Sequence, residues 1–308
     1  MKLKDASVTE ITAWLRRDGL GLRAGPFWFK IHSNTGYFTA PFSALYRDYE
    51  IDPACALPDF HVSVQRALWF RHVLRPQIQF RHDGDRDFHP MSGPEAAVMF
   101  EWGLNWCIST HAHHYLILHA AVVARGDDAL LLSAVSGSGK STLTAALIHH
   151  GWRLLSDELA LVDLTSGLVW GLGRPVNLKG TSIDVIQELV PAAEMVGRAR
   201  SRYKGDVALM RAPTAAIAEI DRPAKVRWII QPTYTGRTQA KFLTVSGAQM
   251  LLSLADNCFN YEVLGETGFN TLGRLVANAG RYQYFYGDAG DAVEDFAQLA
   301  DFGLEQAA

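Results

Sequence analysis

Residues 131–163 read LLSAVSGSGKSTLTAALIHHGWRLLSDELALVD, and SGSGKST in the middle has the form of a loop that wraps phosphates. Such loops follow the pattern G-x-x-x-x-G-K-[ST], in which glycines let backbone N–H groups turn toward phosphate oxygens. Ala134 stands where the pattern has its first glycine, and this change removes no hydrogen-bond donor. The stretch therefore predicts a Walker A phosphate site for a nucleotide.

Each position in this loop has an expected task. Lys140 would reach the β- and γ-phosphates of ATP as a point charge, and the Ser141 hydroxyl would ligate Mg²⁺. The predicted nucleotide-binding residues are Ser136, Gly137, Ser138, Gly139, Lys140, Ser141 and Thr142.

The flanking sequence supports this interpretation. Residues 129–133 are short and apolar like a strand, and Leu143, Leu147 and Ile148 follow at helical spacing. A strand, a glycine loop and a helix in this order aim the helix N-terminus at an anion. The alternative is a Gly/Ser-rich turn that happens to precede Lys-Ser, and the strand and helix patterns disfavour it.

An acidic pair, Asp157-Glu158, follows the predicted helix between two apolar segments. Two carboxylates at a strand end behind a nucleotide loop can divide two tasks. One holds Mg²⁺, and the other accepts a proton from an incoming hydroxyl. The alternative is an acidic turn that faces solvent.

Other polar positions are weaker candidates on the residues alone. His119 lies in the apolar strand pattern LILHAAVV, where a lone histidine is usually a core residue. The histidines of THAHHY, residues 110–115, lack a converging carboxylate or thiolate partner, so we expect a helix end and no zinc site. Arg174 and Lys179, in GLGRPVNLKG, are candidate cations for stabilising a transferring phosphoryl group.

Composition restricts the class of protein. The chain has 308 residues, is 48% hydrophobic and has a formal net charge of −3, without a basic block. These features argue against nucleic acid as the main partner. Its three cysteines are far apart and odd in number, which is typical of reduced thiols. We found no signal peptide or transmembrane-length apolar run, so we expect a cytoplasmic protein without a membrane partner.

Turn residues predict two domains, a small β-rich one over 1–91 and a larger one over 92–308. In the first, residues 7–18 predict a helix. The segments expected to be strands there are PFWFKIHS, GYFTAP, DFHVSVQ and QIQFRH. Ser92-Gly93-Pro94-Glu95 then predicts the start of a helix that runs to about His111.

The second domain mixes strand and helix patterns. The segments expected to be strands are YLILHAAVVA, ALLLSA, RLLSDELALVD, GLVWGLG, VRWIIQPTY and QYFYGD. Helical patterns occupy roughly 181–197, 246–258 and 268–279. This mixture indicates an α/β fold, with a mixed β-sheet core flanked by helices.

Several of these features together resemble one family. A strand histidine (His119), the loop S-G-x-G-K-S at 136–141, a helix, and G-x-R-L-x-x-D-[DE] at 151–158 are similar to HPr kinase/phosphorylase. That family uses ATP to phosphorylate a serine of a small carrier protein. The two ends of the chain look closer to its divergent branch of HPr kinase-related kinases, which accompany peptide-modification clusters. Some members of that branch phosphorylate lasso-peptide precursors.

The resemblance implies a P-loop kinase core with the mixed sheet of HPr kinase and phosphoenolpyruvate carboxykinase. It implies that Asp157 is the general base for the acceptor serine and that His119 lies near the phosphates. HPr kinases are hexamers, so the resemblance allows a homo-oligomer. The family pattern has a second aspartate where this chain has Glu158, and acidic-Ile-Arg where it has residues 168–170, Leu-Val-Trp. The kinase activity is therefore expected, with Glu158 as a Mg²⁺ ligand, but without the phosphorylase activity and without HPr itself as the substrate.

The sequence thus predicts a Mg·ATP-dependent kinase for a serine or threonine of a peptide or small protein, encoded nearby. Two alternatives stay open. One is a nucleotide-binding assembly protein that transfers no phosphate, although the chain lacks the guanine-reading motif N-K-x-D. The other is a small-molecule kinase.

Overall fold

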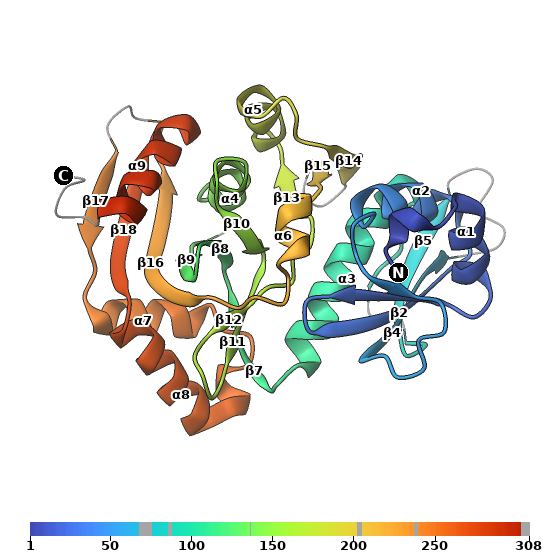
Figure 1. The fold of residues 1–308 in the computed structure, drawn as a ribbon, viewed down its shortest axis with the longest axis horizontal. Helices are drawn as coiled ribbons and strands as arrows, with labels where there is room; N and C mark the ends of the chain where they lie inside the picture. The colour runs from blue at the N-terminus through green and yellow to red at the C-terminus, as the bar shows by residue number, and fades with distance from the viewer. Residues whose placement is uncertain (68–75, 86–87, 136, 202–204, 237–239, 303–308) are drawn as a thin grey trace.

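The computed structural model describes residues 1–67, 76–85, 88–135, 137–201, 205–236 and 240–302. Its N-terminal part forms a six-stranded mixed sheet in the order β3-β1-β2-β4-β5-β6 (Figure 1, blue to cyan). The strands are Leu20–Ala24 (β1), Phe27–Ser33 (β2), Ile51–Asp52 (β3), Phe60–Arg66 (β4), Gln77–His82 (β5) and Met91–Ser92 (β6). In β2, Phe27, Phe29 and Ile31 alternate into the core, as a sheet with one buried face requires.

Two helices join this sheet, and one of them differs from the sequence prediction. Helix α1, Val8–Arg16, begins at the capping box of Ser7 and Glu10. GYFTAP was expected to be a strand, but it lies in helix α2, Gly36–Leu45. Thr35 caps this helix, and Phe38, Phe42 and Leu45 share its buried face, so helical burial outweighs the aromatic strand signal.

A long helix connects the N-terminal sheet to the rest of the chain. Helix α3, Ala96–His111, follows the short helix η2, Gly93–Glu95, whose Ser92–Glu95 capping box confirms the predicted start. It packs against β5 on one side and against β15, Gly205–Met210, on the other. The hydrophobic core continues through both parts. The domain boundary between residues 91 and 92 stays a prediction.

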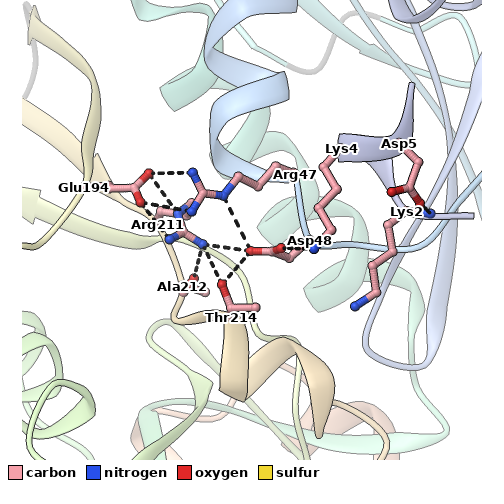
Figure 2. A network of polar contacts seen from close by, with 9 residues as sticks. All are labelled: Lys2, Lys4, Asp5, Arg47, Asp48, Glu194, Arg211, Ala212 and Thr214. Carbon is pink, nitrogen blue, oxygen red and sulfur yellow. Dashed lines mark hydrogen bonds and ion pairs between the residues drawn. The ribbon is translucent and has the colours of Figure 1, made fainter. Parts of the chain in front are cut away.

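A polar network also joins the two parts (Figure 2). Arg211, which follows β15, contacts Asp48 at 2.9 Å between its Nη1 and the Asp48 Oδ2. Arg47 and Arg211 both pair with Glu194. Thr214, at the start of α6, Thr214–Ala218, donates to the Asp48 Oδ2 at 2.7 Å. These contacts fix the end of α2 against the segment between β15 and α6.

The larger part is organised around a second six-stranded mixed sheet, in the order β10-β8-β9-β16-β18-β17. Its strands are Ala121–Arg125 (β8), Asp128–Leu132 (β9), Arg153–Ser156 (β10), Lys225–Tyr234 (β16), Lys241–Thr244 (β17) and Gly280–Tyr286 (β18). The three strands β9, β16 and β18 run parallel to one another. Their carboxyl ends therefore meet at one edge of the sheet, where α/β proteins bind ligands.

Helices cover both faces of this sheet (Figure 1). Leu130 and Leu132 of β9 share a core with α4, Lys140–Ile148, and α9, Ala289–Phe302. Ala129 and Leu131 belong to a second core with α7, Gly247–Asp256, and α8, Tyr261–Ala277. Burial on both faces explains why the β9 sequence is a continuous apolar run without alternation.

Two antiparallel three-stranded sheets complete the fold. They have the orders β12-β11-β7 and β13-β15-β14. The remaining strands are Tyr115–His119 (β7), Leu159–Asp163 (β11), Val169–Trp170 (β12), Val176–Lys179 (β13) and Met195–Ser201 (β14). The pattern at 181–197 is helical only over Ser182–Leu189 (α5), because β14 pairs with β15 from Met195 onward. The expected mixed-sheet α/β fold is confirmed.

No helix in the described part of the chain combines the length and apolar character needed to cross a membrane.

Candidate functional site

The predicted phosphate loop connects β9 to α4. Gly137 and Gly139 have φ values of 87° and 92°, and Gly139 is the N-cap of α4 in the left-handed region. A Cβ atom at Gly139 would lie 2.1 Å from the Tyr286 hydroxyl oxygen, which donates to the Gly139 carbonyl at 3.1 Å. Both the backbone conformation and the available space therefore require glycine at residue 139. Ser136 lies outside the described residues.

A cavity of about 750 Å³ opens beside this loop. Its volume falls within the range of small-molecule and cofactor sites. The predicted site residues that line it are Gly137, Gly139, Lys140, Ser141, Thr142, His119, Glu158 and Lys179. Ser138, Asp157 and Arg174 are not among the described lining residues. The structure thus gathers residues from the loop, β7, β13 and the turn before β11 around one space.

Two lysines, a histidine and one carboxylate form a cluster along the cavity wall. The Lys140 Nζ lies 3.2 Å from the His119 Nε2. Glu158 lies between His119 and Lys179, 4.0 Å from the His119 Nδ1 and 3.9 Å from the Lys179 Nζ. Burial lowers the pKa of Lys140, although Asp157 and Glu158 oppose that shift. Burial, together with the Lys140 charge, also lowers the pKa of His119, so its imidazole is neutral at neutral pH.

Asp157 lies in the tight turn between β10 and β11 and is only 4% exposed. Its Oδ2 accepts a hydrogen bond from the Asn177 N–H at 3.2 Å, while its Oδ1 has no partner among the described residues. Burial and the neighbouring charge of Glu158 raise the pKa of Asp157 to about 6, although Lys140, Asn177 and Ser141 act in the opposite direction. A buried carboxylate oxygen without a partner is costly, so this one points to a function.

Arg174 occupies a different environment from the one expected of a cation that contacts phosphate. Its side chain is buried beside Glu101 of α3, with the Nε 3.9 Å from the Glu101 Oε2, and it donates to the Asn105 side chain. The Tyr46 hydroxyl donates to the same Glu101 carboxylate. The pKa of Glu101 is raised by burial against the opposing charge of Arg174. Arg174 therefore stabilises the contact between α3 and the segment that connects β12 to β13.

Several lining residues were missed by sequence reasoning. Tyr234 and Tyr286 are the last residues of β16 and β18 and pair with each other across the parallel strands. Asp288 precedes α9, and its Oδ1 accepts from the Gly290 N–H at 2.7 Å. The only signal in the sequence was the pair of apolar strand patterns, VRWIIQPTY and QYFYGD, that contain these tyrosines. Without the strand order, nothing in the sequence aligned these ends with the phosphate loop.

The histidines of THAHHY agree with the expected helix end, because α3 ends at His111. Among the described residues, no group of three or more His, Cys, Asp or Glu side chains could hold a metal ion. A site for Mg²⁺ at Ser141 and Glu158 would therefore need oxygen ligands from phosphates and water, which is the usual environment of this ion beside nucleotides.

The arrangement can bind an anion and position a hydroxyl. Lys140 and Lys179 supply positive charge, Gly137 and Gly139 give the loop its left-handed turns, and Asp157 supplies an unpaired carboxylate oxygen. Compared with known proteins, the chain matches no protein-family model and no curated protein.

One solved structure with a detectable likeness is the HPr(Ser) kinase/phosphatase from Coxiella burnetii. It is 11% identical, and the match covers 62% of this chain and 99% of that one with a TM-score of 0.27. A TM-score this low allows at most a distant relationship and establishes neither the fold nor the activity of this chain.

Proposed function

We propose that this protein is a Mg·ATP-dependent kinase that transfers the γ-phosphate to a serine or threonine hydroxyl of a peptide or small protein. The observation that carries the proposal is the buried, unpaired Oδ1 of Asp157, a residue that interacts electrostatically with Glu158 and Lys140, which both line a cavity of about 750 Å³. A carboxylate in this position matches the base that phosphoryl transfer to a hydroxyl requires.

The chain's own groups fit a nucleotide with its metal. The left-handed Gly137 and Gly139 leave the loop amides free to donate to phosphate oxygens, and Lys140 holds the terminal phosphates. Ser141 and Glu158 supply two oxygen ligands for Mg²⁺, which neutralises phosphate charge when bound. Lys179 and His119 also line the cavity, close enough to Glu158 to fix its orientation.

Asp157 would orient the acceptor hydroxyl and take its proton on the Oδ1 as the new P–O bond forms and the bond between the γ-phosphorus and its bridging oxygen breaks, with ADP leaving. A pKa of about 6 leaves the carboxylate ionised at neutral pH, yet more basic than an ordinary aspartate. The Asn177 N–H holds the Oδ2, so the Oδ1 is the oxygen that is left to take the proton. Arg174 acts indirectly in this proposal, by supporting the segment that leads into β13.

The remaining expectations belong to the same proposal. Residues 1–91 form a domain beside the kinase domain of 92–308, and the acceptor is encoded near this chain. The protein works in the cytoplasm. The reverse phosphorylase reaction is weak, because residues 168–170 lack the acidic and arginine side chains of the similar family.

The experiment is calorimetric titration with Mg·ATP followed by single-turnover transfer from labelled ATP to serine-containing peptides. Wild type should bind Mg·ATP and label peptides, while Lys140→Ala should weaken binding by several kcal/mol through loss of charge-assisted contacts. Lys225→Ala is the matched control, because Lys225 is exposed at the opposite end of β16 from Tyr234.

Three outcomes separate the competing functions. Wild-type affinity in Lys140→Ala would overturn the nucleotide site. Binding without transfer to any acceptor would favour a nucleotide-dependent assembly protein, and labelling of small alcohols alone would favour a small-molecule kinase.

A further inference from the structure

A short segment between α7 and α8 is attached to the edge of β7 directly beside the candidate site. The His119 N–H donates to the Asn257 carbonyl at 2.7 Å, and the Phe259 N–H donates to the Ile117 carbonyl at 2.9 Å. The Asn260 side chain accepts from the Ile117 N–H at 3.0 Å. Residues 257–260 therefore behave as one more short strand on the edge of this sheet.

The anchoring residue of this segment is almost completely buried. Asn260 is 1% exposed, and its Nδ2 also donates to the Tyr115 carbonyl at 2.7 Å. Because its amide oxygen and nitrogen both bond to the β7 backbone, the segment has little freedom to rotate or slide. The neighbouring Phe259 is thus held in one position by backbone hydrogen bonds.

Phe259 is nevertheless half exposed, with 50% of its surface open to solvent. Its ring meets the His119 ring edge to face, with centroids 5.9 Å apart and planes at 87°. His119 lines the cavity, whereas Phe259 is not among the described lining residues. A ligand confined to the cavity would not reach this ring, but a polypeptide extending from the cavity past His119 would. A fixed, exposed aromatic side chain is typical of an anchor in a binding interface.

The charged residues near Phe259 in the sequence are acidic. The sequence has no lysine or arginine from residue 242 to residue 273. Within this stretch Asp256, Glu262 and Glu266 are exposed and surround Phe259 in sequence, and Val263 adds an exposed apolar side chain at 67%. The complementary ligand has an apolar residue close to the reacting hydroxyl and basic residues farther away.

We propose that Phe259 anchors the acceptor polypeptide of this kinase by packing against an apolar side chain within a few residues of the phosphorylated serine or threonine. The exposed carboxylates of Asp256, Glu262 and Glu266 favour basic residues in the same acceptor. This inference rests on the proposed kinase function, and it names a peptide with apolar and basic side chains as the substrate class.

The test uses synthetic twelve-residue peptides, each with one central serine, as acceptors for labelled Mg·ATP. One peptide carries Leu beside the serine and Lys farther out. A second replaces the Leu by Asp, and a third replaces the Lys by Glu. The full-length wild type is compared with Phe259→Ala, Phe259→Leu and Phe269→Ala. Phe269 is a matched control, because it is 52% exposed and lies farther along α8.

Wild type should have a kcat/KM for the Leu peptide about tenfold above that for the Asp peptide, the size expected of one interface anchor. The Glu peptide should be a poorer acceptor than the Lys peptide. Phe259→Ala should lose the tenfold preference while the Kd for Mg·ATP stays unchanged, and Phe259→Leu should keep most of it. Phe269→Ala should behave as wild type. A merely structural role for Phe259 would change kcat for both peptides equally.

Two results would overturn the inference alone: an unchanged Leu preference in Phe259→Ala, or a weakened Kd for Mg·ATP in that variant, which would place the nucleotide against the ring. If wild type labels no peptide although it binds Mg·ATP, the proposed kinase function falls and this inference falls with it.

Discussion

Asp48 and Asp157 are both about 4% exposed, but their surroundings shift the pKa values of the two carboxylates in opposite directions. Asp48 accepts hydrogen bonds from Thr214, Lys4 and Arg211 (Figure 2). Burial alone would raise its pKa, but these partners outweigh burial and the pKa of Asp48 is lowered. At Asp157, burial and the acidic neighbour Glu158 outweigh the single backbone donor, and the pKa is raised to about 6.

The difference separates a structural carboxylate from a functional candidate. The network around Asp48 holds two parts of the chain together and leaves few lone pairs free. At Asp157 the chain tolerates a buried charge without a full set of partners, which lowers stability. Strain of this kind tends to persist where a ligand or substrate completes the site.

The largest effect we expect is on catalysis at Asp157. Asp157→Asn keeps the shape and the hydrogen bond with Asn177 but removes the basicity. Single-turnover transfer should slow on the order of 10²-fold or more. The Kd for Mg·ATP should stay within a few-fold, because the loop and Lys140 remain. Wild-type transfer in this variant would show that Asp157 is structural, like Asp48.

The same two aspartates should respond in opposite ways to pH when stability is measured without metal. The pKa of Asp157 is higher in the folded protein than the ordinary value of 3.8, so protonation of this carboxyl favours the folded state. This contribution is fully present below pH 3.8 and is lost as the pH rises to about 6. Relative to wild type, Asp157→Asn should therefore gain about 3 kcal/mol of unfolding free energy between pH 3 and pH 7. Urea denaturation in EDTA measures it.

Asp48→Asn is the matched control for that measurement. Its folded pKa is lowered, so the stability due to ionised Asp48 is present above the unfolded pKa and is lost as pH falls through the folded one. This variant should lose stability relative to wild type at pH 7 and approach it at low pH. The contrast between the two aspartates would be wrong if the stability of both variants, relative to wild type, changed in the same direction with pH.

Loss of the contact between Arg211 and Asp48, drawn in Figure 2, should have a smaller effect than the substitution at Asp157. Arg211→Met removes a donor from buried Asp48 and should lower the free energy of unfolding by about 2 kcal/mol. Arg198→Met should change it by less than about 0.5 kcal/mol, because Arg198 and its partner Asp184 are both exposed. Equal losses in the two variants would remove the distinction between buried and surface pairs.

The smallest effect concerns Glu158, which contacts both His119 and Lys179. If Glu158 holds Mg²⁺, Glu158→Gln should impair transfer less than Asp157→Asn, and raising Mg²⁺ or adding Mn²⁺ should restore part of the rate. Transfer assays across a metal titration measure this. If the transfer rate does not depend on the metal concentration, Glu158 is a positioning residue for His119 and Lys179.

Local sequence signals identified the parts of the site that are close together in the chain. The strand–loop–helix at residues 129–148 is present as β9 and α4, and the Asp157-Glu158 pair lies in the next turn. These predictions succeeded because glycine conformation and helical periodicity act over a few residues. GYFTAP failed for the opposite reason, since packing of α2 against the core outweighed its strand propensity.

The sequence by itself determined the glycine-rich loop, its lysine, the acidic pair and the mixed α/β character of the chain. The tertiary structure alone decided that Arg174 pairs with Glu101, that Tyr286 closes over Gly139, and that Phe259 lies against His119. The physical reason is sequence separation: these contacts depend on strand order and on the parallel alignment of β9, β16 and β18. Burial of both sheet faces selects that order, and no local pattern encodes it.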